Sequence, residues 1–263
     1  MEIEEIPSVL ACDVGNTNIR IACIKGEDVS DVVVVSSDDE HAIAAAIKAA
    51  WDEIPDPKAF AACSVNASAL AHLERAAMAA GAPPVQVVGR DLPLPIETTL
   101  KHPEVVGTDR LCAAVAAYDR LGAACVVADF GTAVTIDCVD DGGVFQGGAI
   151  FPGLHLSAAA LHEHTAQLPQ VTVEAPTWAF GADTREAILA GLFASARGAL
   201  QMLVEAYATA LNHWPLVIAT GGDAAAVVGE IEESSLVQAV VPDLVLRGVA
   251  MAYYNALAKE DAE

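Results

Sequence analysis

The stretches Asp13-Val-Gly-Asn-Thr-Asn18 and Asp129-Phe-Gly-Thr132 decide the fold of this chain. Each follows a short apolar run and precedes a second apolar run that ends in cysteine, a pattern typical of two β-strands joined by a tight turn. The two stretches lie nearly half of the 263-residue chain apart. A fixed sequence pattern that recurs at this distance indicates a duplicated structural unit. In both copies the turn is expected to place a carboxylate and backbone N–H groups at the end of a strand.

The remaining sequence predicts an α/β fold. A third apolar run, residues 216–220, ends in Gly221-Gly222-Asp223. Apolar spacing of three and four residues predicts helices over 41–51, 68–81, 109–121, 184–207 and 246–259, with Thr184 as the N-cap of the fourth. Strands that alternate with helices of this length favour an α/β architecture. A boundary near Gly122 would divide the chain into domains of residues 1–121 and 122–263.

Charge and composition exclude several classes of protein. The chain has 36 acidic and 13 basic residues and a formal charge of −23, so it would repel nucleic acid and anionic membranes. The longest charge-free stretch, residues 142–162, contains five glycines and a proline and does not read as a membrane span. The acidic start MEIEEIP does not fit a signal peptide. Six scattered cysteines without metal or disulfide spacing fit a reducing compartment, and a cytoplasmic protein is expected.

The glycine turns carry the residue types that bind a nucleotide. Gly15 lets the backbone approach a ligand closely, Asn16 and Thr17 supply short donors, and Asp13 can hold a hydrated Mg²⁺. This set suits the phosphate tail of a nucleotide, and residues 129–132 repeat it. The chain contains no GxxxxGK[ST] sequence and no GxGxxG after a strand, which excludes a P-loop and a Rossmann fingerprint.

The order of five motifs resembles a known family. The motifs are DVGNTN (13–18), GTDR (107–110), DFGTAVT (129–135), GGAIFPG (147–153) and ATGGDA (219–224). Together they resemble the type III pantothenate kinases of the acetate and sugar kinase/Hsp70/actin-like superfamily, from about Val9 to Leu257. The resemblance implies two related actin-like (ribonuclease H-like) lobes of mixed sheets with helices, and a nucleotide cleft between them. It also implies a homodimeric transferase that phosphorylates the hydroxyl of pantothenate with ATP, the first step of coenzyme A biosynthesis.

The resemblance further implies a set of site residues. Asp109 would be the catalytic base, Asp129 would bind K⁺ (or NH₄⁺), and Asp13 would hold Mg²⁺ through water. A guanidinium beside the base, that of Arg110, can pair with the carboxylate of pantothenate through two parallel hydrogen bonds. The residues expected to bind ATP are Asp13, Val14, Gly15, Asn16, Thr17, Asn18, Ile19, Arg20 and Thr132. Those expected to bind pantothenate are Leu100, Gly107, Thr108, Asp109, Arg110 and Thr184.

One position departs from the family pattern. Nine residues before the catalytic aspartate the family commonly has a tyrosine, and this chain has Leu100. A leucine can pack against the gem-dimethyl group of pantothenate but cannot donate a hydrogen bond. Two alternatives therefore stay open: a non-catalytic nucleotide-binding accessory or regulatory paralogue, and a kinase of another small hydroxy acid. The acidic and basic residues of the motifs argue against the first alternative, because a protein that only binds does not need the base.

Overall fold

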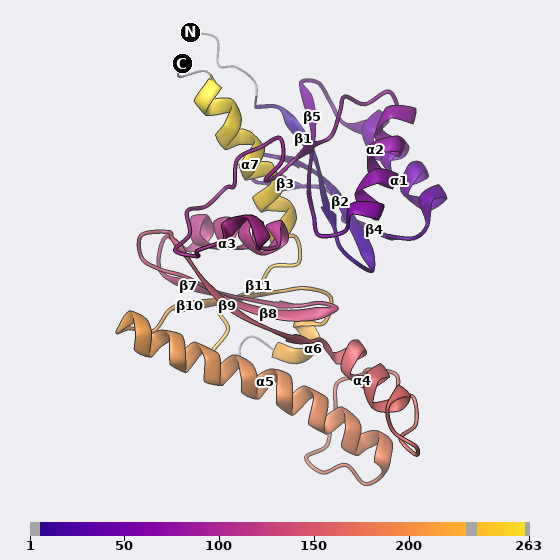
Figure 1. Cartoon of the computed structure of the whole chain (residues 1–263), viewed down its shortest axis with the longest axis vertical. Coiled ribbons are helices and arrows are strands. Elements are labelled where there is room, and N and C mark those ends of the chain that lie inside the picture. The colour runs from indigo at the N-terminus through magenta and orange to yellow at the C-terminus, as the bar shows by residue number, and fades with distance from the viewer. Residues whose placement is uncertain (1–5, 230–235, 261–263) are drawn as a thin grey trace. The chain divides into compact units, whose positions relative to one another are not determined.

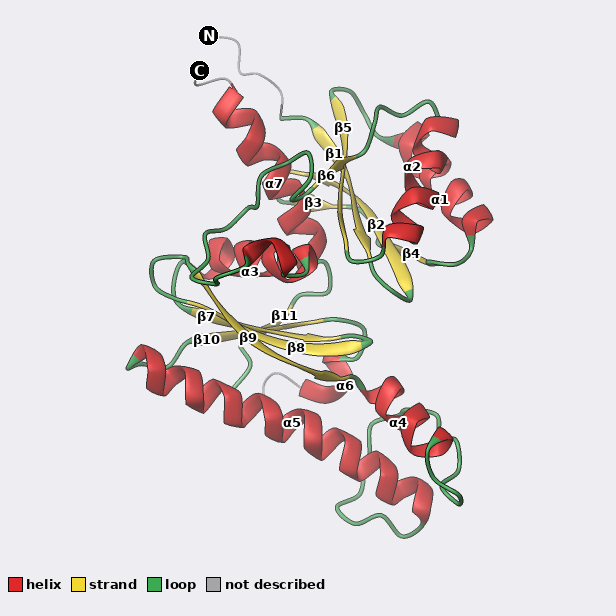
Figure 2. Ribbon diagram, in the orientation of Figure 1, coloured by secondary structure: helices red, strands yellow, loops and turns green. Residues whose placement is uncertain are grey.

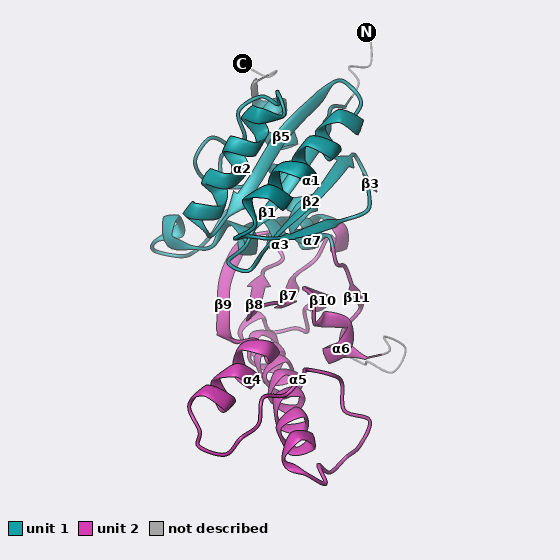
Figure 3. Ribbon diagram, turned by 90° about the vertical axis from the view of Figure 1, so that its right-hand side faces the viewer, with its two compact units in different colours: residues 1–119, 243–263 teal, residues 120–242 magenta. Residues whose placement is uncertain are grey.

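The computed structural model describes residues 6–229 and 236–260, and the chain forms two compact units (Figure 3). Unit 1 comprises residues 1–119 and 243–263, and unit 2 comprises residues 120–242. These units differ from the domains expected from the sequence, 1–121 and 122–263, at the C-terminal end. Residues 243–260 pack with the first part of the chain, so unit 2 is an insertion within unit 1.

Unit 1 is built on a mixed sheet whose strand order is β3-β2-β1-β5-β6, with β4 also paired to β2. Strands β1 and β2 form an antiparallel hairpin, and β5 and β6 add to β1 in parallel. The central position of β1 explains its burial, since nearly every residue of this strand is inaccessible to solvent. The strands are β1 (Ser8–Val14), β2 (Asn18–Lys25), β3 (Asp28–Val29), β4 (Val33–Ser36), β5 (Lys58–Ser64) and β6 (Gln86–Val87).

Helices cover both faces of this sheet (Figure 1). Helices α1 (Glu40–Glu53) and α2 (Ala67–Ala79) pack on one face, and α1 buries Ile43, Ile47 and Trp51 there. Helix α7 (Leu244–Glu260) packs against β1, β2 and β5. Its Tyr254 hydroxyl lies 3.0 Å from the Pro7 carbonyl oxygen and 3.1 Å from that of Ile24. The short helix η1 (Pro103–Val105) and helix α3 (Thr108–Leu121) follow β6.

Unit 2 repeats the sheet of unit 1. Its strand order is β11-β10-β7-β8-β9, in which β7 and β8 form the hairpin, β10 and β11 are parallel to β7, and β9 is antiparallel to β8. The hairpin β1–β2 with β3, β5 and β6 has the same order, so the predicted duplication is confirmed. The strands are β7 (Cys125–Phe130), β8 (Ala133–Val139), β9 (Phe145–Pro152), β10 (Leu216–Thr220) and β11 (Ala239–Val240).

Helices α4 (Leu154–Glu163), α5 (Thr184–Leu211) and α6 (Ala224–Val228) belong to unit 2. Helix α5 runs along its sheet (Figure 2). From Leu189 onward it buries residues three or four positions apart, among them Phe193, Leu200 and Val204. Within the described residues, α5 is the one helix long and apolar enough to cross a membrane. That is weak evidence for a span, because a core helix of this length passes the same test.

The N-cap expected for α5 was wrong by one residue. Asp183 caps the helix, because its Oδ1 accepts a hydrogen bond of 2.8 Å from the Glu186 N–H. The Glu186 carboxylate in turn accepts from the Ala182 N–H at 2.7 Å. A carboxylate reaches the exposed N–H groups of a first turn better than the shorter threonine hydroxyl that follows it, so Thr184 is the first helical residue.

Candidate functional site

The turn between β1 and β2 is held by its own backbone. The Gly15 N–H donates to the Asn18 carbonyl oxygen at 3.0 Å. A Cβ on Gly15 would lie 3.0 Å from the same oxygen, a distance that only a glycine accommodates without a shift. Asn16, Thr17 and Asn18 are exposed beyond it. The turn therefore presents short polar groups to solvent from a tightly closed base.

Ser37 supports this turn from outside, and the sequence analysis missed it. It directly follows β4 and is only 1% exposed. Its hydroxyl donates to the Gly15 carbonyl oxygen at 2.9 Å, and its N–H donates to the Thr17 carbonyl oxygen at 3.0 Å. A serine next to several other polar residues gives no signal in a sequence, because its role depends on which backbone it reaches.

Asp13 is the next-to-last residue of β1, between two neighbouring strands. It is paired in register with Arg20 of β2 and with Cys63 of β5, so the three side chains share one face of the sheet. The Cys63 thiol lies 3.6 Å from Asp13 Oδ1 and donates to it. A hydrogen bond with Cys112, burial, and the charges of Asp13 and Asp109 raise the pKa of the Cys63 thiol well above its usual value. Cys63 therefore keeps its proton and acts as a donor.

The start of α3 is fastened to the end of β5. The Ser64 N–H donates to Thr108 Oγ1 at 3.2 Å, and the Thr108 hydroxyl lies 3.3 Å from the Ser64 carbonyl oxygen. Val65, the next residue, donates its N–H to the Val14 carbonyl oxygen at 3.1 Å. Backbone and side-chain hydrogen bonds within unit 1 thus join the end of β1, the end of β5 and the first turn of α3.

Asp109 lies in this first turn with a fixed carboxylate. Its Oδ1 accepts a hydrogen bond of 2.8 Å from the Arg110 N–H, and both residues are half-buried. A Cβ on Gly107 would overlap Asp109 Oδ1 and would contact Val65. Gly107 is therefore needed for space, and any side chain there would displace the Asp109 carboxylate.

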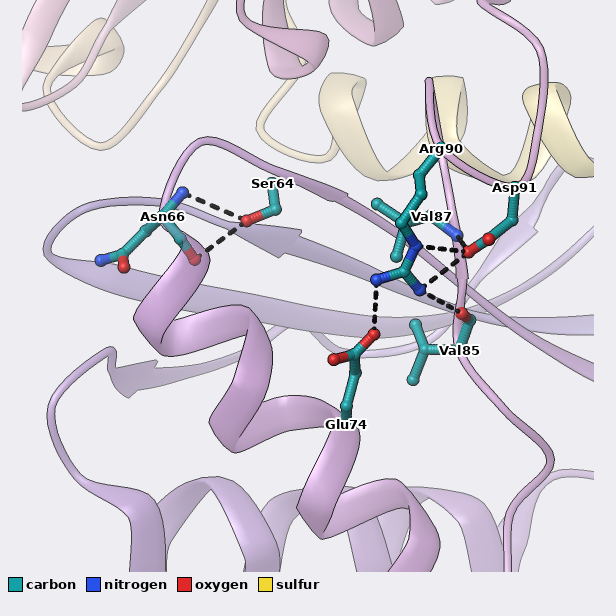
Figure 4. A network of polar contacts seen from close by, with 7 residues as sticks. All are labelled: Ser64, Asn66, Glu74, Val85, Val87, Arg90 and Asp91. Atoms are coloured by element: carbon teal, nitrogen blue, oxygen red, sulfur yellow. Dashed lines mark hydrogen bonds and ion pairs between the residues drawn. The ribbon is translucent and has the colours of Figure 1, made fainter.

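The loop after β6 supports the same helix start (Figure 4). Arg90 pairs with Glu74 of α2 at 2.7 Å and with its neighbour Asp91 at 2.8 Å. Asp91 Oδ2 also accepts from the Val87 N–H at 2.9 Å. A Cβ on Gly89, which has φ +83°, would lie 3.3 Å from the Thr108 methyl carbon, so the braced loop lies against Thr108.

Leu100 lies on the segment between β6 and η1. It is half-buried, and its N–H donates to Thr98 Oγ1 at 3.1 Å. This is the position at which the chain has a leucine in place of the family's tyrosine. The hydrogen bond fixes the backbone at this position, whichever side chain it carries.

The β7–β8 turn of unit 2 closes in the same way as the first turn. The Gly131 N–H donates to the Ala133 carbonyl oxygen at 3.2 Å, and Thr132 is exposed beside it. Two more turns meet this one. The Gly153 N–H donates to the Thr132 carbonyl oxygen at 3.0 Å, and a Cβ on Gly153 would overlap the Gly131 carbonyl oxygen.

The third turn of unit 2 follows β10. Gly221 has φ +94°, and a Cβ there would overlap Asp129 Oδ1 and the Phe130 carbonyl oxygen. The Asp223 N–H donates to that carbonyl oxygen at 3.0 Å, and Asp223 Oδ1 lies 3.3 Å from His155 Nε2. The turns after β7, β9 and β10 therefore converge around Asp129.

The predicted site residues fall into two groups. Unit 1 brings together the Asp13–Arg20 turn and the Gly107–Arg110 helix start, and it also contains Leu100. Unit 2 contains Asp129, Thr132 and Thr184. Of these, Thr184 does not lie at the strand-end turns: it is exposed at the start of α5, which packs against α4.

A family model described as type III pantothenate kinase matches residues 9–206. A type III pantothenate kinase of Dehalococcoides mccartyi is 31% identical over 252 residues, which covers 93% of this chain and 96% of the relative. One of Syntrophotalea carbinolica is 32% identical over 255 residues, with 93% and 98% covered. The match to a third, from Thermomicrobium roseum, is 38% identical but spans only 61% of that relative and 62% of this chain.

Two solved structures have a similar fold. One, a Campylobacter jejuni protein described as a Baf family transcriptional activator, has a TM-score of 0.58, 18% identity, and covers 97% of this chain and all of its own. The other, component A of the Acidaminococcus fermentans (R)-2-hydroxyglutaryl-CoA dehydratase, has a TM-score of 0.53, 16% identity, and covers 98% and 100%. At these identities the likeness concerns the fold alone. With the duplicated mixed sheets, it confirms the expected actin-like α/β class.

Proposed function

Because this chain belongs to the type III pantothenate kinase family, we propose that it transfers the γ-phosphoryl group of ATP to the hydroxyl of pantothenate. The product is 4′-phosphopantothenate, and the reaction is the first step of coenzyme A biosynthesis. One observation carries the proposal: the carboxylate of Asp109 is fixed beside Arg110 on a helix start that hydrogen bonds fasten to the β5 end. That strand is the register neighbour of the Asp13 strand.

Asp109 is the general base of the proposed reaction. A half-buried carboxylate can accept the proton of the substrate hydroxyl as the phosphoryl group leaves ATP. The Arg110 N–H donates to Oδ1, which restrains the position of that oxygen. Because the proton and the phosphoryl group must move along defined directions, this restraint favours the transfer.

Arg110 and Leu100 are proposed to position pantothenate. The Arg110 guanidinium pairs with the substrate carboxylate through two parallel hydrogen bonds. It also supplies positive charge in a chain whose formal charge is −23. Leu100 packs against the gem-dimethyl group, an apolar contact that replaces the family's tyrosine. Gly107, Thr108 and Thr184 complete the proposed pantothenate site.

The two glycine turns are proposed to bind ATP. Exposed N–H groups and short polar side chains at a tight turn stabilise phosphate oxygens, and the turn containing Gly15 has this form. The proposed ATP-binding residues are Asp13, Val14, Gly15, Asn16, Thr17, Asn18, Ile19, Arg20 and, in unit 2, Thr132.

The kinase family implies ATP with a divalent metal ion. The described residues contain no group of three or more histidine, cysteine, aspartate or glutamate side chains that could hold a metal ion. A single carboxylate can bind a cation whose remaining ligands are water molecules or phosphate oxygens. We therefore propose that Asp13 holds Mg²⁺ through water and that Asp129 binds K⁺ or NH₄⁺. When bound, these cations neutralise the charge of the transferring phosphoryl group.

The proposal extends to assembly and location. We propose a cytoplasmic homodimer, in which Thr184 reaches the pantothenate site near the subunit interface. The reduced cysteines of the chain are compatible with a reducing compartment. Sedimentation equilibrium would show one dimeric species at enzyme-assay concentrations, and a monomer would contradict this part of the proposal.

The test is ADP release from Mg-ATP in potassium buffer, with and without pantothenate. We expect release that depends on pantothenate and falls by about 10³-fold in Asp109→Asn, because a positioned base contributes about 10²–10⁴-fold. Asp119→Asn, on the exposed side of the same helix, is the matched control and should retain activity. ATP binding without pantothenate-dependent release would favour the accessory protein, whereas release with another hydroxy acid would favour the kinase of a different substrate.

A further inference from the structure

Thr220 is the last residue of β10 and one of the few buried polar residues, with 1% of its surface exposed. Its hydroxyl oxygen is inaccessible and has no hydrogen-bond partner among the described residues. A buried hydroxyl without a partner is destabilising. Buried hydroxyl groups normally have a hydrogen-bond partner. Because the described residues supply none here, the Thr220 hydroxyl is free to bind a ligand from outside them.

The neighbour of Thr220 is the candidate cation ligand. Strands β7 and β10 are parallel, and their register pairs Thr220 with Asp129. Register partners in a sheet point to the same side, so the hydroxyl and the carboxylate lie on one face at adjacent strand ends. A Cβ on Gly221 would overlap both Asp129 Oδ1 and the Phe130 carbonyl oxygen, so these two oxygens lie close together beside the Gly221 turn.

The duplication of the fold provides an internal comparison. In unit 1 the residue equivalent to Thr220 is Cys63, the next-to-last residue of β5 and the register partner of Asp13. There the thiol donates to the aspartate at 3.6 Å. In unit 2 the equivalent hydroxyl makes no such bond to any residue that the structure describes. Within those residues, the same position thus makes an internal hydrogen bond in unit 1 and none in unit 2.

Oxygen atoms of this kind suit a monovalent cation. One carboxylate balances one positive charge, and a hydroxyl adds a neutral hard ligand, the type that alkali and alkaline-earth ions prefer over nitrogen and sulfur. A divalent ion held by protein alone would call for more carboxylates than this place offers among the described residues. We infer that Thr220 Oγ1 is a direct ligand of a monovalent cation that it shares with Asp129.

This inference rests on the proposed function, since it adds a ligand to the cation site proposed there. It assigns to Thr220 a role in binding the cation and none in the proton transfer. A loss of the hydroxyl should therefore raise the cation concentration needed to fill the site.

The first experiment measures the cation without turnover. Crystals of the full chain with a non-hydrolysable ATP analogue are soaked in RbCl, and Rb⁺ is located by its anomalous scattering. We expect a peak within ligand distance of both Thr220 Oγ1 and an Asp129 carboxylate oxygen. A water molecule on Thr220, or a peak that contacts Asp129 but not Thr220, would overturn the inference, whether or not the enzyme phosphorylates pantothenate.

The second experiment compares variants by thermal unfolding, with K⁺ titrated against tetramethylammonium at constant ionic strength. Thr220→Val should raise the K⁺ concentration for half-maximal stabilisation about tenfold, which corresponds to about 1.4 kcal/mol. Thr220→Ser should restore it, because serine keeps the hydroxyl. Cys63→Ala removes the polar group at the equivalent position of unit 1 and should not change the K⁺ midpoint. An unchanged midpoint in Thr220→Val would overturn the inference.

Discussion

Asp109 owes its orientation to a residue that has no side chain. Gly107 stands two positions earlier, and the space where its Cβ would be is filled by Asp109 Oδ1. The same oxygen accepts the Arg110 N–H. Glycine here does not serve a left-handed backbone, and its function is to leave room for the carboxylate.

Gly107→Ala should therefore lower kcat by about 10²-fold, because a catalytic group displaced by about 1 Å can lose that much. ATP affinity should stay near the wild-type value, since the atoms nearest to this Cβ belong to Asp109 and Val65. Steady-state kinetics with ADP detection would measure both effects.

The matched control is Gly191→Ala in α5, where a Cβ would meet nothing within 4 Å. This variant should keep its activity and gain about 0.5–1 kcal/mol of stability, as expected when alanine replaces glycine in a helix. An equal loss of kcat in both variants would mean that the fall in kcat does not come from the filled space beside Asp109.

Ser37 gives a second prediction at this scale. Ser37→Ala removes the hydrogen bond to the Gly15 carbonyl oxygen and keeps the N–H bond to Thr17. The turn should loosen, and the KM for ATP should rise by about five- to tenfold, the equivalent of about 1 kcal/mol for one hydrogen bond. Ser36→Ala, at the exposed neighbour, should leave KM unchanged. An effect on pantothenate KM alone would contradict the assignment of this turn to ATP.

Among the connecting elements, the loop after β6 contributes a pH-dependent stability. Hydrogen bonding to Arg90 holds the pKa of Asp91 below its usual value, and the Val87 N–H adds to this, against the opposing effect of burial. Because the folded pKa lies below the unfolded one, the contribution is present above about pH 4 and is lost as pH falls through the folded pKa.

Asp91→Asn should lower the free energy of unfolding at pH 7 by about 0.5–1 kcal/mol, a small value because the Arg90 and Asp91 side chains are 49% and 40% exposed. The difference from wild type should shrink below about pH 4. Urea unfolding at both pH values measures it. A difference that grows toward acid pH would show that Asp91 does not act through its charge.

Local pattern was enough to predict most elements. The five helices expected from apolar spacing all exist as α1, α2, α3, α5 and α7, with ends shifted by a few residues. Strands β3, β4, β5, β6, β9 and β11 and helices η1, α4 and α6 were not predicted. For β9 and α4 the reason is that five glycines and a proline between residues 142 and 153 obscure the period. The glycine turns could be predicted since each carries its own signal.

Contacts between distant segments could not be predicted. Ser37 reaches Gly15, and Thr108 reaches Ser64, across sequence separations of 22 and 44 residues. The partner in each case is a backbone group, which any residue could supply. For the same reason the sequence did not indicate a role for Thr220, because that role depends on its register with Asp129.

The charge of the whole molecule affects how its substrates arrive. A chain at −23 repels ATP and pantothenate, which are both anions at pH 7. Salt weakens this repulsion, because the screening length falls to about 10 Å at 0.1 M ionic strength. At fixed K⁺ and Mg²⁺, kcat/KM for ATP should rise several-fold as tetramethylammonium chloride increases from about 0.01 to 0.2 M. A steady fall over this range would show that local positive charge dominates the approach.

The insertion of unit 2 within unit 1 has a consequence during translation. The chain leaves unit 1 at Asp119 and re-enters it at Asp243, so unit 2 has emerged in full while unit 1 still lacks α7. Until α7 leaves the ribosome, the face of β1, β2 and β5 that α7 covers stays open to water and to chaperones. A ribosome whose exit tunnel still holds α7 would thus carry a nascent chain with unit 2 outside the tunnel and one bare apolar sheet in unit 1, and emergence of α7 would complete the older part of the polypeptide last.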